Sequence, residues 1–328
     1  MNATLILGAG FSHIAGLPLT KDLFNTPDIP RAKSKDVVER FKQVQFAWSK
    51  WKQENSSGTA EEWLRLIYEK KLFASYGATW EDALDFAMAR LVNLPPGKNA
   101  PYYHGITTSV QDETHRHFWP FIRERFEIKS VVTMNYDILA EQGLKKSYSK
   151  HRQAPLCFYG GFPYTQTVRM MKDVVTRKHE KVPLGHEVAI YKMHGSINWA
   201  NEPHSFKIHD DVRAAFRSTR EPGSVAIIPP MPEEEIPEWL TKVWEYAKSA
   251  LADSYIWIVC GYSLPQYDIA LKNLFKEAAR KTRGLEIYIL DPVSESLKSR
   301  WEALVPSETK IYALPGLPEC LETRYWNV

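Results

Sequence analysis

The chain has 328 residues, of which 44% are hydrophobic and 25% charged, and its formal net charge is +3. This composition is typical of a folded globular protein and argues against a disordered one, and so small a charge does not indicate nucleic-acid binding. The amino terminus lacks the basic and apolar regions of a signal peptide, and no run approaches the roughly 20 apolar residues that span a bilayer. We therefore expect a cytoplasmic protein whose partners include neither a membrane nor a nucleic acid.

Apolar runs of strand length recur along the chain, and several are β-branched and nearly continuous. Strands that are buried on both faces of a parallel sheet have this character. Residues 236–251 and 270–280 between the later runs carry apolar side chains at helical spacing. Alternating strands and helices predict a doubly wound, mostly parallel, Rossmann-like α/β sheet. The predicted strands are residues 4–7, 130–133, 188–193, 224–228, 255–260, 285–290 and 310–314.

Between the first two predicted strands lies a block, about residues 30–128, that has the pattern of an inserted helical module. A capping box, Thr59 with Glu62, opens one helix, and Thr79 with Asp82 opens another more weakly. The other predicted elements are helices at 35–52 and 107–126 and a loop at 93–101.

A second, loop-rich insertion, about residues 147–185, is rich in Gly, Pro, Tyr and basic residues. A mobile loop over a site and a peripheral loop or hairpin are equally compatible with it. With both insertions included, we interpret residues 1–328 as one domain.

Three cysteines, Cys157, Cys260 and Cys320, occur without any Cys-x-x-Cys spacing. Zinc ribbons, redox centres and disulfide frameworks are therefore disfavoured, and we expect no bound metal. Cys260 lies in an apolar run and is expected to be an inert core thiol.

The first predicted strand ends at the segment Gly8-Ala9-Gly10-Phe11-Ser12. Glycines allow the backbone to approach a ligand, and a helix amino terminus favours phosphate. The general dinucleotide fingerprint requires a third glycine where this chain has His13. A tight strand-to-helix turn without a ligand is therefore the alternative.

Polar residues also follow the next two predicted strands, at residues 130–133 and 188–193. Asn135 and Asp137 follow residues 130–133, where capping of the next helix is a slightly favoured alternative. His194 follows residues 188–193 and is a possible proton acceptor near neutral pH. A lone histidine is more often a structural residue, but its place at a strand end, beside Gly195, favours a role in a site.

Two later strand ends complete the series, one at Gly261 and Ser263 and one at Asp291. An acidic residue at such a position can bind both hydroxyls of a ribose, although Asp291 before a proline is also a normal helix start. Five strand ends with glycine or small polar residues together predict a polar crevice along one edge of a parallel sheet.

Taken in order, these segments resemble the sirtuin superfamily, and most closely its bacterial sirtuin-like branch found in antiphage defence proteins. The first segment, followed by Gly16-Leu17-Pro18, is similar to the phosphate-binding element of that family, residues 133–137 to its Thr-Gln-Asn-x-Asp element, and His194-Gly195 to its catalytic His-Gly. Residues 227–230 and 261–264 resemble later elements of the branch. The likeness covers residues 1–24 and about 129–304.

Two departures separate the chain from protein-deacylating sirtuins. It lacks the paired Cys-x-x-Cys motifs of their zinc module, and it has Leu19-Thr20-Lys21 where they have Asp-Phe-Arg. The resemblance therefore implies the activity of the defence branch, which is hydrolysis of NAD to ADP-ribose and nicotinamide.

The resemblance also implies roles for individual residues. Asn135 and His194 would be catalytic, and Asp137 would support the nicotinamide pocket. The remaining NAD-binding residues would be Gly8, Ala9, Gly10, Phe11 and Ser12 at the diphosphate and Gly261, Ser263 and Asp291 toward the adenosine.

Two alternatives stay open: a sensor or scaffold subunit that binds NAD or ADP-ribose without turnover, and an NAD-dependent deacylase or ADP-ribosyltransferase. The family implies control by assembly, so we expect a homo-oligomer. A separate sensor or a HerA-type ATPase is a possible partner.

Overall fold

The structure is a computed structural model that describes residues 2–26, 35–69, 77–92, 113–148, 157–160, 188–202, 205–208 and 225–326. The predicted loop at 93–101, the start of the predicted helix at 107–126 and most of the loop-rich insertion at 147–185 lie outside these residues.

A parallel sheet of seven strands forms the centre of the described structure, in the order β10-β9-β8-β1-β2-β4-β3. Every pairing in this sheet is parallel, which confirms the predicted doubly wound, mostly parallel α/β fold. Its strands are β1 (Asn2–Leu7), β2 (Glu127–Thr133), β3 (Cys157–Tyr159), β4 (Val188–Lys192), β8 (Ile256–Cys260), β9 (Glu286–Leu290) and β10 (Lys310–Leu314).

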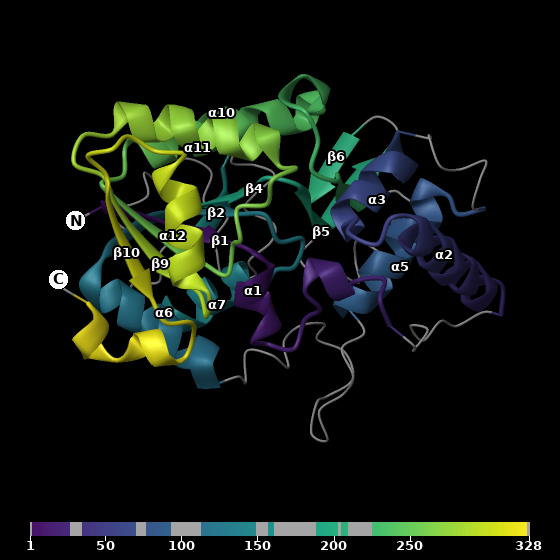
Figure 1. Cartoon of the computed structure of the whole chain (residues 1–328), viewed down its shortest axis with the longest axis horizontal. Helices are drawn as coiled ribbons and strands as arrows, with labels where there is room; N and C mark the ends of the chain where they lie inside the picture. Colours follow the sequence, from purple (N-terminus) through teal and green to yellow (C-terminus); the bar gives the residue numbers. More distant parts are fainter. Residues whose placement is uncertain are drawn as a thin grey trace.

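Alternate side chains of the central strands enter two separate cores because successive residues of a strand point to opposite faces. Ile6 of β1 packs in the first core, while Leu5 and Leu7 pack in the second. Both faces are covered by helices (Figure 1), which explains why these strands are apolar without alternation. The first core contains α10 (Glu238–Ala252), α11 (Ile269–Lys281) and α12 (Ser294–Glu302), and the second contains α6 (Glu113–Arg125) and α7 (Leu139–Tyr148).

A third core holds the helices of the insertion between β1 and β2, which lie together on one side of the sheet (Figure 1). Its aromatic centre includes Phe24, Trp48 and Trp63. The helices are α2 (Lys35–Glu54), α3 (Ala60–Tyr68) and α5 (Trp80–Val92). The last helix of this stretch, α6, instead packs on the sheet, where Phe118, Trp119 and Ile122 join the second core.

The helix starts follow the predicted capping residues. Thr59 accepts a hydrogen bond from the Glu62 amide and Glu62 returns one to the Thr59 amide, so the capping box is present. Thr79 accepts from the Asp82 amide at 2.9 Å. Short helical segments complete the described structure: α1 (Ala9–His13), η1 (Thr20–Asp22), η4 (Glu233–Glu235), η5 (Glu319–Leu321) and η6 (Thr323–Tyr325).

We had expected the run at 224–228 to be a strand of the parallel sheet, and this prediction was wrong. The run forms β7 (Val225–Ile227), which pairs antiparallel with β5 (Gly195–Glu202) in a separate sheet of order β6-β5-β7, with β6 at Ser205–Ile208. A buried apolar run has the same composition in either kind of sheet, so composition alone does not distinguish them. This small sheet continues from β4 and places β5 between the large sheet and the inserted helices (Figure 1).

Candidate functional site

The carboxyl ends of the parallel strands meet at one edge, and the predicted site residues follow five neighbouring strands there. Along the edge, Asp291 follows β9, Gly261 follows β8, Gly8 follows β1, Asn135 lies two residues after β2, and His194 lies two residues after β4. The chain runs outward from β1 in one direction through β2 and in the other through β8. The topological switch point, where open α/β sheets bind ligands, therefore lies between β1 and β8.

The two loops at the switch point touch through glycine backbone. A Cβ atom on Gly8 would lie 2.5 Å from the carbonyl oxygen of Gly261, and one on Gly10 would lie 2.8 Å from the Gly261 Cα. Gly261 itself has a φ of 62°, a conformation that favours glycine. The glycines of the first segment are thus required by the contact between β1 and β8, whether or not a ligand is bound.

The same contact uses part of the hydrogen-bonding capacity that we had expected to face phosphate. The Gly8 amide donates to the Cys260 carbonyl at 3.1 Å, and the Gly10 amide donates to the Gly261 carbonyl at 2.9 Å. Ala9 is the first residue of α1, where the amide has no acceptor within the helix. Its amide is therefore the donor of this segment best placed to meet an anion.

The side chains of Phe11 and Ser12 point away from the switch point into the protein. The Phe11 ring is buried and stacks on His115 at a centroid distance of 4.4 Å, so only its backbone is available to a ligand. Cys260 is likewise buried, and burial raises the pKa of its thiol, as expected for an inert core cysteine.

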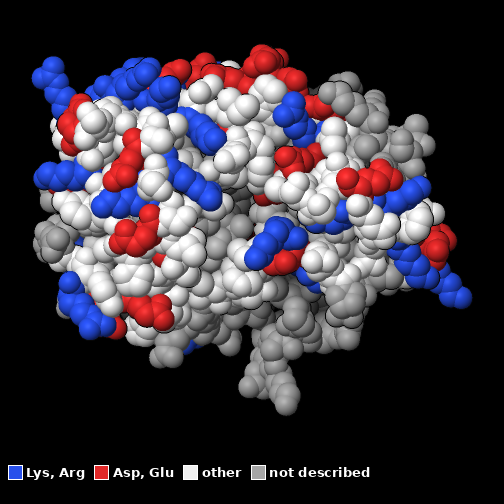
Figure 2. Space-filling model, viewed as in Figure 1, with Lys and Arg blue, Asp and Glu red and all other residues white. Residues whose placement is uncertain are grey.

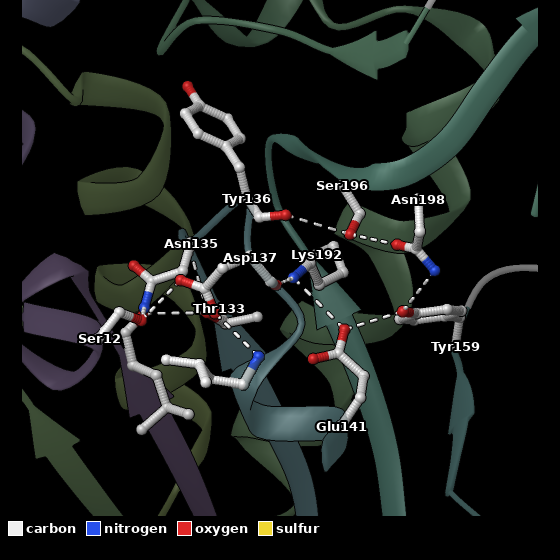
Figure 3. Close-up of polar contacts among 12 residues, drawn as sticks. Ser12, Thr133, Asn135, Tyr136, Asp137, Glu141, Tyr159, Lys192, Ser196 and Asn198 are labelled. Atoms are coloured by element: carbon white, nitrogen blue, oxygen red, sulfur yellow. Dashed lines mark hydrogen bonds and ion pairs between the residues drawn. The ribbon is translucent and has the colours of Figure 1, made fainter. Parts of the chain in front are cut away.

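A chain of hydrogen bonds links Ser12, Asn135 and Asp137 (Figure 3). The Asn135 side-chain amide donates to Ser12 Oγ at 2.9 Å, and the Ser12 hydroxyl donates to Asp137 Oδ2 at 2.6 Å. Asp137 Oδ1 accepts from the Leu139 amide at the start of α7. Asp137 is 5% exposed, so its carboxylate is engaged within the protein, where it holds Ser12 and, through it, Asn135.

The orientation of the Asn135 amide follows from its second partner. The nitrogen Nδ2 also lies 2.8 Å from the Gly8 carbonyl, and a carbonyl oxygen only accepts hydrogen bonds. The NH₂ group must therefore face Gly8 and Ser12, and Oδ1 points away from this network (Figure 3). Asn135 presents an acceptor oxygen at the sheet edge, held by two anchors.

A buried lysine, Lys192, binds the loop that carries Asn135 and Asp137. Lys192 of β4 is fully buried, and its ammonium donates to the main-chain carbonyl of Asp137 and pairs with Glu141 at 3.3 Å. Glu141 Oε1 also accepts from the Tyr159 hydroxyl at 2.8 Å. Figure 3 shows that these groups continue to Asn198 and Ser196 of β5. The network ties the loop that carries Asn135 to the strand that precedes His194.

His194 is 3% exposed, and neither of its ring nitrogens has a hydrogen-bond partner among the described residues. Tyr136 and Trp244 flank its ring at centroid distances of 6.4 and 6.3 Å. Its Nε2 lies 3.7 Å from Oδ2 of Asp268, which is 2% exposed. A buried imidazole with unused hydrogen-bonding capacity is unusual and calls for an explanation.

A second group of acidic and phenolic side chains surrounds Tyr136. Its hydroxyl donates to the Ile228 carbonyl at 3.1 Å, and burial together with the charges of Glu61 and Asp268 raises its pKa. Burial likewise raises the pKa of Glu61, although its hydrogen bonds to Tyr267, Thr20 and Thr59 act in the opposite direction. Glu61 lies on α3, so the inserted helices contribute a carboxyl group beside the site.

The residues expected toward the adenosine lie on the other side of the switch point. Ser263 is exposed, and its carbonyl accepts from Arg300 at 3.0 Å. Asp291 is partly exposed, and its Oδ1 accepts from the Val293 amide at 3.0 Å, just before α12. Asp291 therefore forms the helix-start turn that we had considered as the alternative, and its Oδ2 takes no part in that hydrogen bond.

Three polar residues of the site, Asp268, Lys192 and Glu61, were missed in the sequence. Asp268 lies at a helix start rather than a strand end, Lys192 is a charged residue inside an otherwise apolar strand, and Glu61 lies in an insertion outside the family resemblance. The sequence signal was present for Lys192, because a charge in a buried strand requires a partner.

Neither a membrane segment nor a metal centre occurs in the described part of the chain. No helix there is long and apolar enough to cross a membrane. No group of at least three His, Cys, Asp or Glu side chains there is arranged to hold a metal ion.

Fold and site together define a doubly wound α/β protein in which glycine loops meet at the topological switch point and a buried histidine follows a strand on one side of it. No family model matches the chain, and no curated protein does so. Solved structures that it matches include Sir2 homologues. A mutant Sir2 homologue bound to 2'-O-acetyl-ADP-ribose matches with a TM-score of 0.42 and 14% identity, over 97% of this chain and 87% of that one.

Two further matches are of the same kind. Sir2Tm bound to a propionylated peptide gives a TM-score of 0.43 and 13% identity, over 97% of this chain and 88% of that one. A Sir2 homologue in complex with NAD gives a TM-score of 0.42 and 14% identity, over 94% of this chain and 83% of that one. At these scores and identities, the likeness assigns neither a family nor a substrate to this chain.

Proposed function

We propose that this protein is a sirtuin-like NAD glycohydrolase that releases nicotinamide and ADP-ribose. The observation that carries the proposal is His194, a buried imidazole with both ring nitrogens unused at the edge of a doubly wound sheet. The choice of NAD as the substrate is supported by the sequence resemblance of the surrounding segments. It is also supported by the general rule that sheets of this kind bind dinucleotides at the switch point.

The reaction needs positioning more than strong acid–base chemistry. Cleavage of the bond between the ribose C1' and the nicotinamide nitrogen gives the bond pair to nicotinamide, whose ring charge is thereby neutralised. Water adds its oxygen to C1' and loses a proton. The protein must therefore hold the ribose and a water in line and stabilise the positive charge that develops on the sugar.

Two side chains are suited to these tasks. Asn135 Oδ1 faces away from its anchors and accepts a hydrogen bond from the water or a ribose hydroxyl. His194 accepts the proton, directly or through a ribose hydroxyl. The Ala9 amide and the amino-terminal end of α1 meet the diphosphate, while Ser263 and Asp291 lie toward the adenosine.

The biological part of the proposal is antiphage defence by NAD depletion, with activity controlled by assembly into a homo-oligomer or by a partner protein. It is supported by the same sequence resemblance.

The test is nicotinamide release from NAD by the purified protein, alone and with its native partner. We expect His194→Ala to lower the rate by about 10²- to 10⁴-fold, the usual contribution of a general base. Asn135→Ala should lower it by about 10²-fold or more, because the water or ribose loses its positioning contact. The matched control is His117→Ala, which removes an exposed histidine on α6. Folded variants at positions 194 and 135 that retained full activity, or a wild type that released no nicotinamide, would contradict the proposal. Calorimetric NAD binding without release would then favour a binding role.

A further inference from the structure

The His194 ring has a single charged neighbour among the described residues, the carboxylate of Asp268. The distance from Nε2 to Oδ2 is 3.7 Å, and both side chains are almost fully buried. This distance is longer than a hydrogen bond, but catalytic hydrogen bonds are often long before substrate binds and shorten in the complex.

Asp268 is fixed by its other contacts. It caps α11, with Oδ1 3.4 Å from the Leu271 amide, and Oδ2 lies 3.4 Å from the Tyr262 hydroxyl. One contact comes from its own helix and the other from the loop after β8. The carboxylate therefore stays beside the imidazole.

A neutral imidazole carries one N–H donor and one acceptor nitrogen, whereas an ionised carboxylate only accepts hydrogen bonds. We propose that Asp268 is the positioning residue of His194: it holds the imidazole as the Nε2–H tautomer and leaves Nδ1 as the acceptor nitrogen. Tyr136 and Trp244 flank the ring and limit its movement, so the partner of Nε2 determines the nitrogen that faces a reactant.

The catalytic consequence rests on the proposed function. In the hydrolysis, Nδ1 takes the proton from water or a ribose hydroxyl, and the Asp268 carboxylate stabilises the imidazolium that forms. The carboxylate itself stays ionised, as in other carboxylate–histidine pairs that fix a tautomer.

The experiment measures the tautomer directly, by the ¹⁵N resonances of histidine-labelled protein at a pH where His194 is neutral. The His194 signals are identified by their loss in His194→Gln. Asp268→Asn keeps the shape and the helix cap, because Asn caps helices as well as Asp does. Asp268→Ser also keeps a cap but has a shorter side chain that does not reach the ring. Tyr262→Phe is the control, since it removes one neutral partner of Asp268 but keeps the carboxylate and its helix-cap contact with the Leu271 amide.

We expect the Nε2–H form in the wild type and in Tyr262→Phe, and a mixture or the Nδ1–H form in both Asp268 variants. Nicotinamide release should fall about 10²-fold or more in the Asp268 variants, with KM changed less than about threefold, because a tautomer defect acts on the chemical step. An Nδ1–H tautomer in the wild type, or an unchanged Nε2–H tautomer in folded Asp268→Ser, would overturn the inference. A wild type that lacks NAD hydrolysis would overturn the proposed function alone, since the tautomer is measured without substrate.

Discussion

For Asn135, the sequence predicted the position of the side chain but not its hydrogen-bond partners. Its position after a buried strand predicted a polar side chain at the sheet edge, and the structure places it there. Its anchors were not predicted, because Ser12 lies 123 residues away in the chain and no local pattern reports such a contact. The same holds for Asp137, whose role in a nicotinamide pocket stays a prediction and whose carboxylate binds Ser12 and the α7 backbone.

The Ser12 hydroxyl is expected to matter for catalysis because it orients Asn135. Ser12→Ala removes the acceptor of the Asn135 amide and a donor to buried Asp137, so we expect a loss of stability of about 1–3 kcal/mol and a fall in kcat of up to about 10²-fold. Urea unfolding and nicotinamide release measure the two effects.

Ser254→Ala is the matched control for Ser12→Ala. Ser254 is also buried and hydrogen-bonded, at 2.6 Å to Thr4, but it precedes β8 and lies at the opposite end of the sheet. It should lose comparable stability and keep its kcat. Equal kcat values for the two variants would contradict the role assigned to Ser12.

Among the elements, six of the seven strands of the parallel sheet were predicted, because burial on both faces leaves continuous apolar runs. The seventh, β3, has only three residues and lies within the segment that we had interpreted as a loop-rich insertion. β5 was missed because polar residues interrupt its apolar ones. Ser196 and Asn198 are fully buried and hydrogen-bonded to each other, while Ile197 and Trp199 are buried on the other face. β7 was predicted as a strand but placed in the wrong sheet. The pairing partner of a short apolar run depends on distant chain segments, and hydrophobicity alone does not encode it.

The ion pair between Lys192 and Glu141 joins β4 to α7 in the protein interior. Lys192→Met leaves the Glu141 carboxylate buried without its cation, and we expect a loss of about 3–5 kcal/mol in the free energy of unfolding. Adding Glu141→Gln should restore much of that loss, because the uncompensated charge is removed. Urea unfolding of both variants and of the double variant measures the coupling.

Lys310→Met provides the comparison for an exposed ion pair. Lys310 pairs with Glu286 at 3.0 Å on the surface, where a pair contributes at most about 1 kcal/mol. If Lys192→Met were no more destabilising than Lys310→Met, the structural role of the buried pair would be refuted.

At the scale of the whole molecule, Glu61 of the inserted helices lies close enough to Tyr267, just before α11, for the two side chains to influence each other's pKa. The mixture of acidic and basic residues on the face shown in Figure 2 forms no extended patch of one sign, in keeping with the small net charge. The partners of Glu61 could not be predicted, because the insertion falls outside the segments that resemble a known family.

The raised pKa of Glu61 makes the contact sensitive to pH. Because the folded state raises this pKa above the ordinary value of 4.5, folding favours the protonated carboxyl. The associated stability is present below pH 4.5 and is lost as the pH rises through the folded-state pKa. Glu61→Gln, which keeps an acceptor for Tyr267, should therefore raise the melting temperature near pH 8 relative to wild type, and the difference should vanish near pH 4.

Thermal unfolding across this pH range tests the prediction, with Glu39→Gln as the control for removing an exposed carboxyl, on α2. A difference between Glu61→Gln and wild type that stayed constant over the whole range would contradict it.

The glycine contact between the loops after β1 and β8 has a consequence for how this protein can diversify. Where Gly8, Gly10 and Gly261 meet, the two loops touch through main chain, and a new Cβ atom at any of these positions collides with the opposite loop. Residues larger than glycine therefore do not fit at these positions. A change of substrate preference must come from side chains elsewhere along the carboxyl ends of the strands. The inserted helices and the residues after β4 can change independently of that contact, so this architecture keeps one constant region and leaves its surroundings open to adaptation.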